Sequence, residues 1–161
     1  MRETGGVPLA SLVRRLGHRR WFARAGRLLV PADRLVGRLT RGRVVALGLL
    51  PSLLLTTTGR RSGQPRTTPL LYVRDGESFV VIGSNWGQAS HPAWSGNLLA
   101  HPQATVTVDG RAIGVRATLA EGPERERLRG LLLEMWPAYA TYERRAGARH
   151  LRIFRLDPAS R

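Results

Sequence analysis

Residues 53–72, with the sequence LLLTTTGRRSGQPRTTPLLY, decide the fold that this chain can adopt. The segment Leu53–Thr58 is apolar and rich in β-branched residues, a composition typical of a strand. Gly59 and Gly63 then mark a turn, and strand composition resumes at Thr67. We therefore predict a strand, a tight basic loop and a second strand.

The loop of this hairpin carries the arginines Arg60, Arg61 and Arg66. Glycine lets a backbone approach a ligand closely and turn N–H groups toward an anion, and a guanidinium offers a rigid fork of donors that matches a phosphate or a carboxylate. The loop is not of the GxxxxGK[ST] kind, because it has no lysine and a strand follows it. Two interpretations stay open at this point: an anion-binding loop and a solvated basic hairpin.

The composition is that of one globular domain. A chain of 161 residues with 42% hydrophobic residues is long enough for one core and too short for two comfortable ones. It has no cysteine, which excludes disulfides and thiolate metal sites and leaves the redox compartment open. No stretch is long and apolar enough for a secretory signal or a membrane span, so we expect a cytoplasmic protein.

The charge of the chain is strongly basic and uneven. All 26 basic residues are arginine, and the formal net charge is +15. Residues 1–49 hold 11 arginines against Glu3 and Asp33, a net charge of +9, so we treat them as a basic N-terminal arm. An excess of this size favours anionic partners: nucleic acid, acidic lipid or a phosphorylated cofactor.

This arm contains an amphipathic pattern. Apolar residues from Trp21 to Leu39 recur at spacings of three and four, which predicts helices interrupted near Pro31. Two interpretations stay open: residues 18–43 dock on the chain's own domain, or they contact an anionic membrane at the inner face of the cell membrane. We expect no nucleic-acid binding, because the aromatic residues lie in the apolar stripe rather than on a stacking platform.

Strand and turn signals alternate along the rest of the chain. Asp75-Gly76 and Asp109-Gly110 are strong signals for tight hairpins. Prolines at 92 and 123 open helices, a third proline at 137 bends or restarts the second helix, and Gly147 ends it. The expected strands are Leu53–Thr58, Thr67–Arg74, Ser78–Gly83, Ala104–Val108, Arg111–Leu119 and Leu151–Leu156.

These elements predict an α+β, mainly β domain over residues 50–161. Six short strands with helices before, within and after them favour a six-stranded antiparallel split β-barrel with surrounding helices. A barrel also hides the strand edges that would otherwise be exposed. The alternative architecture is an open α+β sheet.

The domain offers few catalytic side chains of its own. The four histidines are not paired at metal-ligand spacing, and the serines lack a nucleophile elbow. This pattern suits a binding protein or an enzyme whose chemistry belongs to a cofactor. In the second case the basic loop would hold an anionic tail, and the loop Ser84–Ser90 would point N–H groups at the ligand. Trp86 would cover an aromatic ring, and Tyr139 and Tyr142 would line a substrate pocket.

Two longer motifs together resemble the deazaflavin-dependent nitroreductase family of actinobacteria. They are LLLTTTGRRSGQPRTTPLLYVRDG, residues 53–76, and VVIGSNWGQASHPAWSGNLLAHPQATV, residues 80–106. The resemblance extends over residues 31–157. It implies a split β-barrel that binds coenzyme F420, a hydroxylated deazaflavin with a phosphate and a polyglutamate tail, whose flat ring would rest inside the barrel of strands.

The resemblance also implies roles for individual residues. The basic loop would hold the phosphate and the tail, and the loop from Ser84 to Gly87 would contact the ring or the phosphate. The catalytic candidates, which would hydrogen-bond the acceptor and assist proton delivery, are Tyr142, Tyr139 and Ser84. The implied cofactor-binding residues are Gly59, Arg60, Arg61, Ser62, Gly63, Arg66, Pro69, Ser84, Asn85, Trp86, Gly87, His91, Trp94 and Asn97.

The implied activity is hydride transfer from reduced deazaflavin to an electron-poor small molecule such as a quinone, an enone or a nitro compound. Arg61 stands where the family often has lysine, and the charge is kept. Asn85 and Trp86 stand where nitroreducing members have lysine and glycine, which removes a cation and adds bulk. The rival hypotheses are an FMN enzyme on a similar barrel and a haem- or lipid-binding protein without F420 turnover. A homodimer is one assembly open to the chain.

Overall fold

The computed structural model describes residues 50–159. The predicted arm, residues 1–49, its helices and the membrane contact of residues 18–43 lie outside the described residues, and the division of the chain at residue 50 stays a prediction. Within residues 50–159, no helix is long and apolar enough to span a bilayer.

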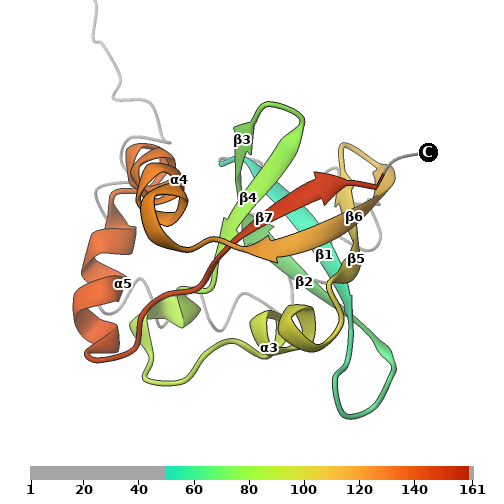
Figure 1. The fold of residues 1–161 in the computed structure, drawn as a ribbon, viewed down its shortest axis with the longest axis horizontal. Coiled ribbons are helices and arrows are strands. Elements are labelled where there is room, and N and C mark those ends of the chain that lie inside the picture. The colour runs from blue at the N-terminus through green and yellow to red at the C-terminus, as the bar shows by residue number, and fades with distance from the viewer. Residues whose placement is uncertain (1–49, 160–161) are drawn as a thin grey trace, which may run out of the picture.

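The described domain is built on one antiparallel sheet of seven strands in the order β2-β1-β5-β6-β7-β4-β3 (Figure 1). The edge strands β2 and β3 follow each other in the chain, so the sheet curls until its two edges are joined through a single residue, Tyr72. It is therefore a curled half-barrel rather than a closed barrel or a flat open sheet. The strands are β1 Ser52–Thr58, β2 Pro65–Leu71, β3 Val73–Asp75, β4 Ser78–Ile82, β5 Gln103–Val108, β6 Arg111–Leu119 and β7 Ile153–Pro158.

The prediction of six strands is wrong, because the expected strand Thr67–Arg74 is two strands. Its first part pairs with β1 and its last part pairs with β4, at opposite edges of the sheet. The break falls at Tyr72, whose N–H donates to the carbonyl of Pro51 at 3.2 Å and whose ring lies 5.5 Å from that of Phe79. The sequence PLLYVR is continuously strand-like, so its composition carries no signal for this change of partner.

Both predicted hairpins are present. At the second one, Val108 pairs with Arg111, and Asp109 and Gly110 have φ angles of 50° and 76°, as a two-residue hairpin turn requires. At the first, Asp75 itself pairs with Ser78, so the turn residues are Gly76 and Glu77. The shift of one residue leaves the strand pairing that the sequence predicts unchanged.

Within the described residues, three α-helices accompany the sheet: α3 Ala93–Ala100, α4 Gly122–Met135 and α5 Ala138–Ala146. Figure 1 shows α4 and α5 together on one side of the sheet, and α3 at the end of the sheet where the β1–β2 loop projects. The prolines lie at helix starts as predicted: Pro92 precedes α3, Pro123 lies in the first turn of α4, and Pro137 separates α4 from α5.

Two buried clusters hold the domain together, and one of them fills the curled sheet. This inner cluster joins side chains from β1, β4, β5, β6 and β7 with Trp94 and Leu98 of α3, all at most 8% exposed. The outer cluster packs α4 and α5 on Val80 and Ile82 of β4. Because side chains fill the inside of the sheet, the expectation that a flat cofactor ring rests there is wrong.

Candidate functional site

The basic loop between β1 and β2 is a tight backbone structure with exposed side chains. The N–H of Gly59 donates to the carbonyl of Gln64 at 2.8 Å, and the N–H of Gly63 donates to the carbonyl of Gly59 at 2.7 Å. A Cβ at position 59 would come within 2.6 Å of the Ser62 hydroxyl and 3.1 Å of the Gln64 carbonyl, so a larger residue would require both groups to shift. Residues 60–66 are all exposed, so the side chains of Arg60 and Arg61 in the loop and of Arg66, the second residue of β2, are accessible.

Helix α3 anchors the start of this loop through Asn97. The side chain of Asn97 is 5% exposed; its Oδ1 accepts the N–H of Arg60 at 3.1 Å, and its Nδ2 donates to Thr57 Oγ1 at 3.0 Å. The guanidinium of Arg60 lies over Gly96, where a Cβ would overlap its Nη1. Asn97 thus holds the loop in place with both polar ends of its carboxamide.

The second predicted loop contains a left-handed turn. Asn85, Trp86 and Gly87 have φ angles of 44°, 56° and 76°, and the turn closes through an N–H···O bond of 2.9 Å from Gly87 to Ser84. Among the described residues, the N–H groups of Ser84, Asn85 and Trp86 meet no acceptor. Strained left-handed residues of this kind concentrate at functional sites, and successive N–H groups in such a turn can bind an anion or a carbonyl oxygen.

The turn packs directly on α5. A Cβ at Gly87 would come within 2.8 Å of Arg145 Cβ and 2.9 Å of the Tyr142 carbonyl. Trp86 is half-buried and meets the ring of Tyr142 edge-on, with the ring centres 6.0 Å apart. The absence of a side chain at position 87 therefore decides how close the turn can come to the helix.

The two predicted catalytic tyrosines lie on the buried face of α5. Tyr139 is 5% exposed and Tyr142 is 1% exposed, with their ring centres 6.1 Å apart. Burial raises the pKa of both phenols; for Tyr142 a hydrogen bond with Trp136 and the charge of Arg145 oppose that rise. Both hydroxyls are therefore protonated at neutral pH. Their role in proton delivery stays a prediction.

The other predicted residues divide between loop and core. Ser84 is half-buried, and its hydroxyl hydrogen-bonds no residue in the described part of the chain. Pro69 is half-buried in β2 opposite Leu54. Trp94 is 5% exposed and packs on Phe154 with a centre-to-centre distance of 5.8 Å, so it belongs to the inner cluster.

Arg149 is a site residue that sequence reasoning missed. Its guanidinium donates to three carbonyls of the turn segment: Gly83 at 2.9 Å, Ser84 at 2.7 Å and Gln88 at 2.9 Å. It also lies 3.4 Å from His91 Nδ1. The chain has 26 arginines, and Arg149 lies in no recognisable motif. Its only signal in the sequence is its position two residues after Gly147, the predicted end of a helix.

His91 is held in its neutral form by these surroundings. Burial is the main cause that lowers its pKa, and the charges of Arg152 and Arg149 add to the effect. A neutral imidazole can accept the hydrogen bond that Arg149 offers. Across residues 50–159, no group of three or more histidine, aspartate or glutamate side chains could hold a metal ion.

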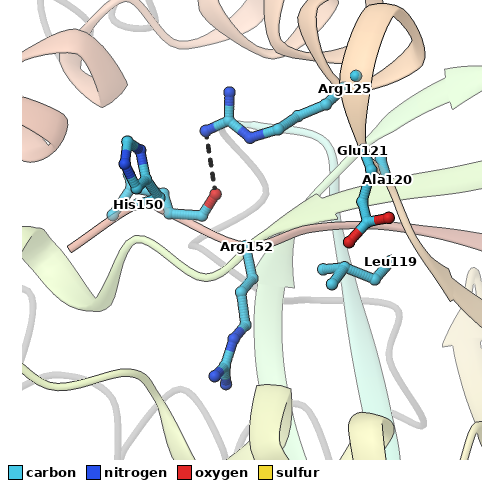
Figure 2. A pocket seen from close by; sticks show the side chains of 8 residues that line it. Leu119, Ala120, Glu121, Arg125, His150 and Arg152 are labelled. Atoms are coloured by element: carbon cyan, nitrogen blue, oxygen red, sulfur yellow. Dashed lines mark hydrogen bonds between the residues drawn. The ribbon is translucent and has the colours of Figure 1, made fainter.

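An open depression of about 410 Å³ lies apart from these loops (Figure 2). Figure 2 shows Arg125 reaching toward the chain segment that carries His150 and Arg152, where it donates to the carbonyl of Leu151 at 3.3 Å. None of the predicted site residues lines it. Its lining residues are Leu119, Ala120, Glu121, Gly122, Arg125, His150, Leu151 and Arg152.

Comparison with solved structures defines the class of protein. The fold matches that of an F420H2-dependent reductase, FDR-A, with a TM-score of 0.62 and 32% identity over 66% of this chain and 94% of that one. A second structure, described as a domain-swapped dimer, matches with a TM-score of 0.63 and 30% identity over 79% of this chain and 99% of that one. The half-barrel is thus a fold that this chain shares with an F420H2-dependent reductase.

Sequence comparison gives the family. The model of the F420H2-dependent quinone reductase family matches residues 33–158. An F420H2-dependent quinone reductase of Mycobacterium tuberculosis is 40% identical over 101 residues, which are 61% of this chain and 68% of that protein. The chain belongs to the F420H2-dependent quinone reductase family, and it is an oxidoreductase whose cofactor is coenzyme F420. The resemblance to deazaflavin-dependent enzymes is confirmed, and the FMN, haem and lipid hypotheses are not favoured.

Proposed function

We propose that this protein uses reduced F420 to reduce a quinone, and that the cofactor binds between the basic loop and the left-handed turn Asn85–Gly87. One observation carries the proposed location: both segments present donors that meet no acceptor among residues 50–159, and they lie outside a sheet whose interior is filled. Quinone is the acceptor that the family description and the Mycobacterium tuberculosis relative both name.

The donors fit the charge of the cofactor. Arg60 and Arg61 are exposed on a loop that is anchored at its base, and Arg66 is exposed at the start of β2, so they can bind a phosphate and an acidic tail without ordering the backbone first. Gly59, Ser62 and Gly63 shape that loop. In this proposal Asn97 is a positioning residue, because both ends of its carboxamide are already hydrogen-bonded within the protein.

The turn would hold the ring end of the cofactor. The N–H groups of Ser84, Asn85 and Trp86 can donate to an oxygen of the ring or of the phosphate, and Trp86 can cover a flat face. His91 would support this end through its contact with Arg149, and Trp94 and Pro69 stay predicted members of the site.

The bound cofactor supplies the hydride, and the protein supplies position and proton donors. The proposed donors are Ser84, whose hydroxyl is not engaged by any described residue, and the phenols of Tyr139 and Tyr142, which stay protonated at neutral pH. Ser84 is half-buried and could hydrogen-bond a quinone oxygen as it becomes negatively charged, whereas the two phenols, 5% and 1% exposed, would have to act from within the buried face of α5.

The direct test is anaerobic turnover by the purified full chain. Reduced F420 would be mixed with a soluble naphthoquinone, an enone or a nitroaromatic compound, and the return of oxidised F420 absorbance would be followed. We expect the highest kcat/KM with the quinone and no turnover when reduced FMN replaces reduced F420. Turnover with FMN but not with F420 would refute the proposal.

Two partner hypotheses remain proposals. A related protein forms a domain-swapped dimer, which supports a homodimer here, to be tested by light scattering of the purified chain. Contact of residues 18–43 with an anionic membrane is tested by co-sedimentation with vesicles. Binding to neutral and anionic vesicles alike, or to neither, would remove the electrostatic hypothesis.

A further inference from the structure

Arg149 satisfies three carbonyls of one short segment. The guanidinium donates through Nε to Gln88, through Nη1 to Gly83 and through Nη2 to Ser84, at distances of 2.7–2.9 Å. It forms no ion pair with a carboxylate in residues 50–159. A half-buried arginine whose donors serve only backbone carbonyls and a neutral histidine acts on backbone conformation rather than on charge balance.

The direction of these carbonyls fixes the direction of the N–H groups. In a planar trans peptide, the C=O of one residue and the N–H of the next point in opposite directions. Because the carbonyls of Gly83 and Ser84 point at Arg149, the N–H groups of Ser84 and Asn85 point away from it. These are two of the N–H groups that find no acceptor among the described residues.

The turn needs such a restraint because its conformation is intrinsically unfavourable. Asn85 and Trp86 are non-glycine residues in the left-handed region, which costs about 1–2 kcal/mol per residue. The side chain of Asn85 closes the segment from one side by donating to the Ser90 carbonyl at 2.9 Å. Arg149 closes it from the other side, at both ends of the turn.

We infer that Arg149 is a positioning residue for F420 binding, which orients the Ser84 and Asn85 peptides so that their N–H groups face the cofactor. This inference rests on the proposed function, because it takes the turn to be the ring end of the site. Arg149 does not touch the cofactor itself; it acts through the backbone. A variant without its guanidinium binds F420 weakly although every residue that contacts the cofactor is unchanged.

The experiment compares Arg149→Ala with Arg152→Ala in the full chain. Arg152 is the matched control, because it lies on the same segment and carries the same charge, yet its guanidinium binds the Ser95 hydroxyl at 3.3 Å rather than the turn. F420 affinity is measured by fluorescence titration. We expect Arg149→Ala to weaken binding about tenfold or more, equivalent to about 1.4 kcal/mol per factor of ten, and Arg152→Ala to change it by no more than about threefold.

Two further readouts separate positioning from a general loss of structure. Millimolar guanidinium chloride, but not equal sodium chloride, should restore part of the affinity of Arg149→Ala by refilling the vacated site. Hydrogen exchange without cofactor should speed up in residues 83–90 of this variant and stay unchanged in β5 and β6. If Arg149→Ala does not fold, Arg149→Lys serves in its place, with an intermediate loss of affinity and faster exchange in the same residues.

The outcomes are distinct. A wild-type chain that does not bind F420 overturns the proposed function. A wild-type chain that binds F420, together with Arg149 variants that bind like Arg152→Ala and keep the turn protected, overturns the positioning role alone. Weak binding by Arg149→Ala that guanidinium does not improve, with normal exchange in residues 83–90, also overturns it.

Discussion

The carboxamide of Asn97 joins α3 to the first residue of the basic loop: its Oδ1 accepts the N–H of Arg60 at 3.1 Å. The same carboxamide donates through Nδ2 to Oγ1 of Thr57, near the end of β1, at 3.0 Å. Thr57 is 1% exposed and Asn97 is 5% exposed, so neither group has water as a ready substitute. The loop that carries the arginines is therefore held by a partly buried hydrogen bond to a helix residue that lies 37 residues later in the chain.

Replacing Asn97 with alanine should weaken both folding and cofactor binding. The change removes the acceptor of the Arg60 N–H and the donor to Thr57 Oγ1, which keeps only its 3.5 Å contact with the Arg66 carbonyl, and an unpaired polar group that is buried costs about 1–3 kcal/mol. Urea unfolding should show this loss, and F420 titration should show weaker binding. Gln103→Ala is the control, since Gln103 is exposed at the start of β5. Equal stability of the two variants would show that the carboxamide contact contributes little.

Gly87→Ala should destabilise the protein more than Gly63→Ala. Both glycines have positive φ angles, 76° and 66°, so both alanine variants carry a backbone cost of about 1–2 kcal/mol. Only at position 87 would the new Cβ meet other atoms, Arg145 Cβ at 2.8 Å and the Tyr142 carbonyl at 2.9 Å, whereas nothing lies within 4 Å at position 63. The overlap adds about 1–3 kcal/mol. Chemical unfolding measures the difference, and indistinguishable midpoints would contradict the packing of the turn on α5.

The sequence predicts most of this fold because the decisive signals are local. Alternating apolar residues set β5 and β6, and Asp109-Gly110 sets their turn, so both strands lie within a residue of the expected bounds. The break at Tyr72 could not be predicted, because it depends on which distant strand each half pairs with. A local pattern does not report a partner.

The residues of the candidate site likewise divide into those that local sequence patterns predict and those that depend on distant contacts. The basic loop and the segment from Ser84 to Gly87 are visible in the sequence, because glycines and clustered arginines have local meaning. Arg149 is not, since its role depends on carbonyls 61 to 66 residues away. The sequence also did not predict that the interior is filled, because strands have the same apolar pattern whether their side chains line a ligand cavity or pack on one another.

The two tyrosines of α5 should respond differently to loss of their hydroxyls. The Tyr139 hydroxyl has no hydrogen-bond partner among the described residues, so Tyr139→Phe should change the free energy of unfolding by less than about 0.5 kcal/mol. Tyr142→Phe removes the hydrogen bond with Trp136 and should cost about 1 kcal/mol. If either phenol delivers the proton, its variant should also lose about a hundredfold in kcat at unchanged F420 affinity. Unchanged kcat in both variants would remove the tyrosines from the catalytic proposal.

His91 should titrate below the ordinary histidine pKa of about 6.5. Burial, then Arg152 and Arg149, lower its pKa in the folded state. Between that lowered pKa and about 6.5 the unfolded chain binds more protons than the folded chain, so stability rises with pH in this window and falls on acidification. NMR titration of the His91 ring measures the pKa directly, and Arg152→Ala should raise it. A folded-state pKa at or above 6.5 would contradict the neutral imidazole that the contact with Arg149 requires.

The central claim is that the basic loop holds the acidic end of F420, and equilibrium titration of the full chain with F420 tests it most directly. Arg61→Ala is compared with Arg111→Ala. Arg111 is exposed and pairs with Val108 at the last residue of β5, whereas the end of β1 next to the basic loop pairs with the start of β5, Thr57 with Ala104. Arg111 therefore lies at the opposite end of β5 from the basic loop. We predict binding well below millimolar for the wild type and for Arg111→Ala, and a loss of about tenfold for Arg61→Ala, as expected for one charged contact of about 1.5 kcal/mol or more. Equal affinity of both variants would contradict the assignment of the loop, and wild-type affinity no better than millimolar would contradict the account as a whole.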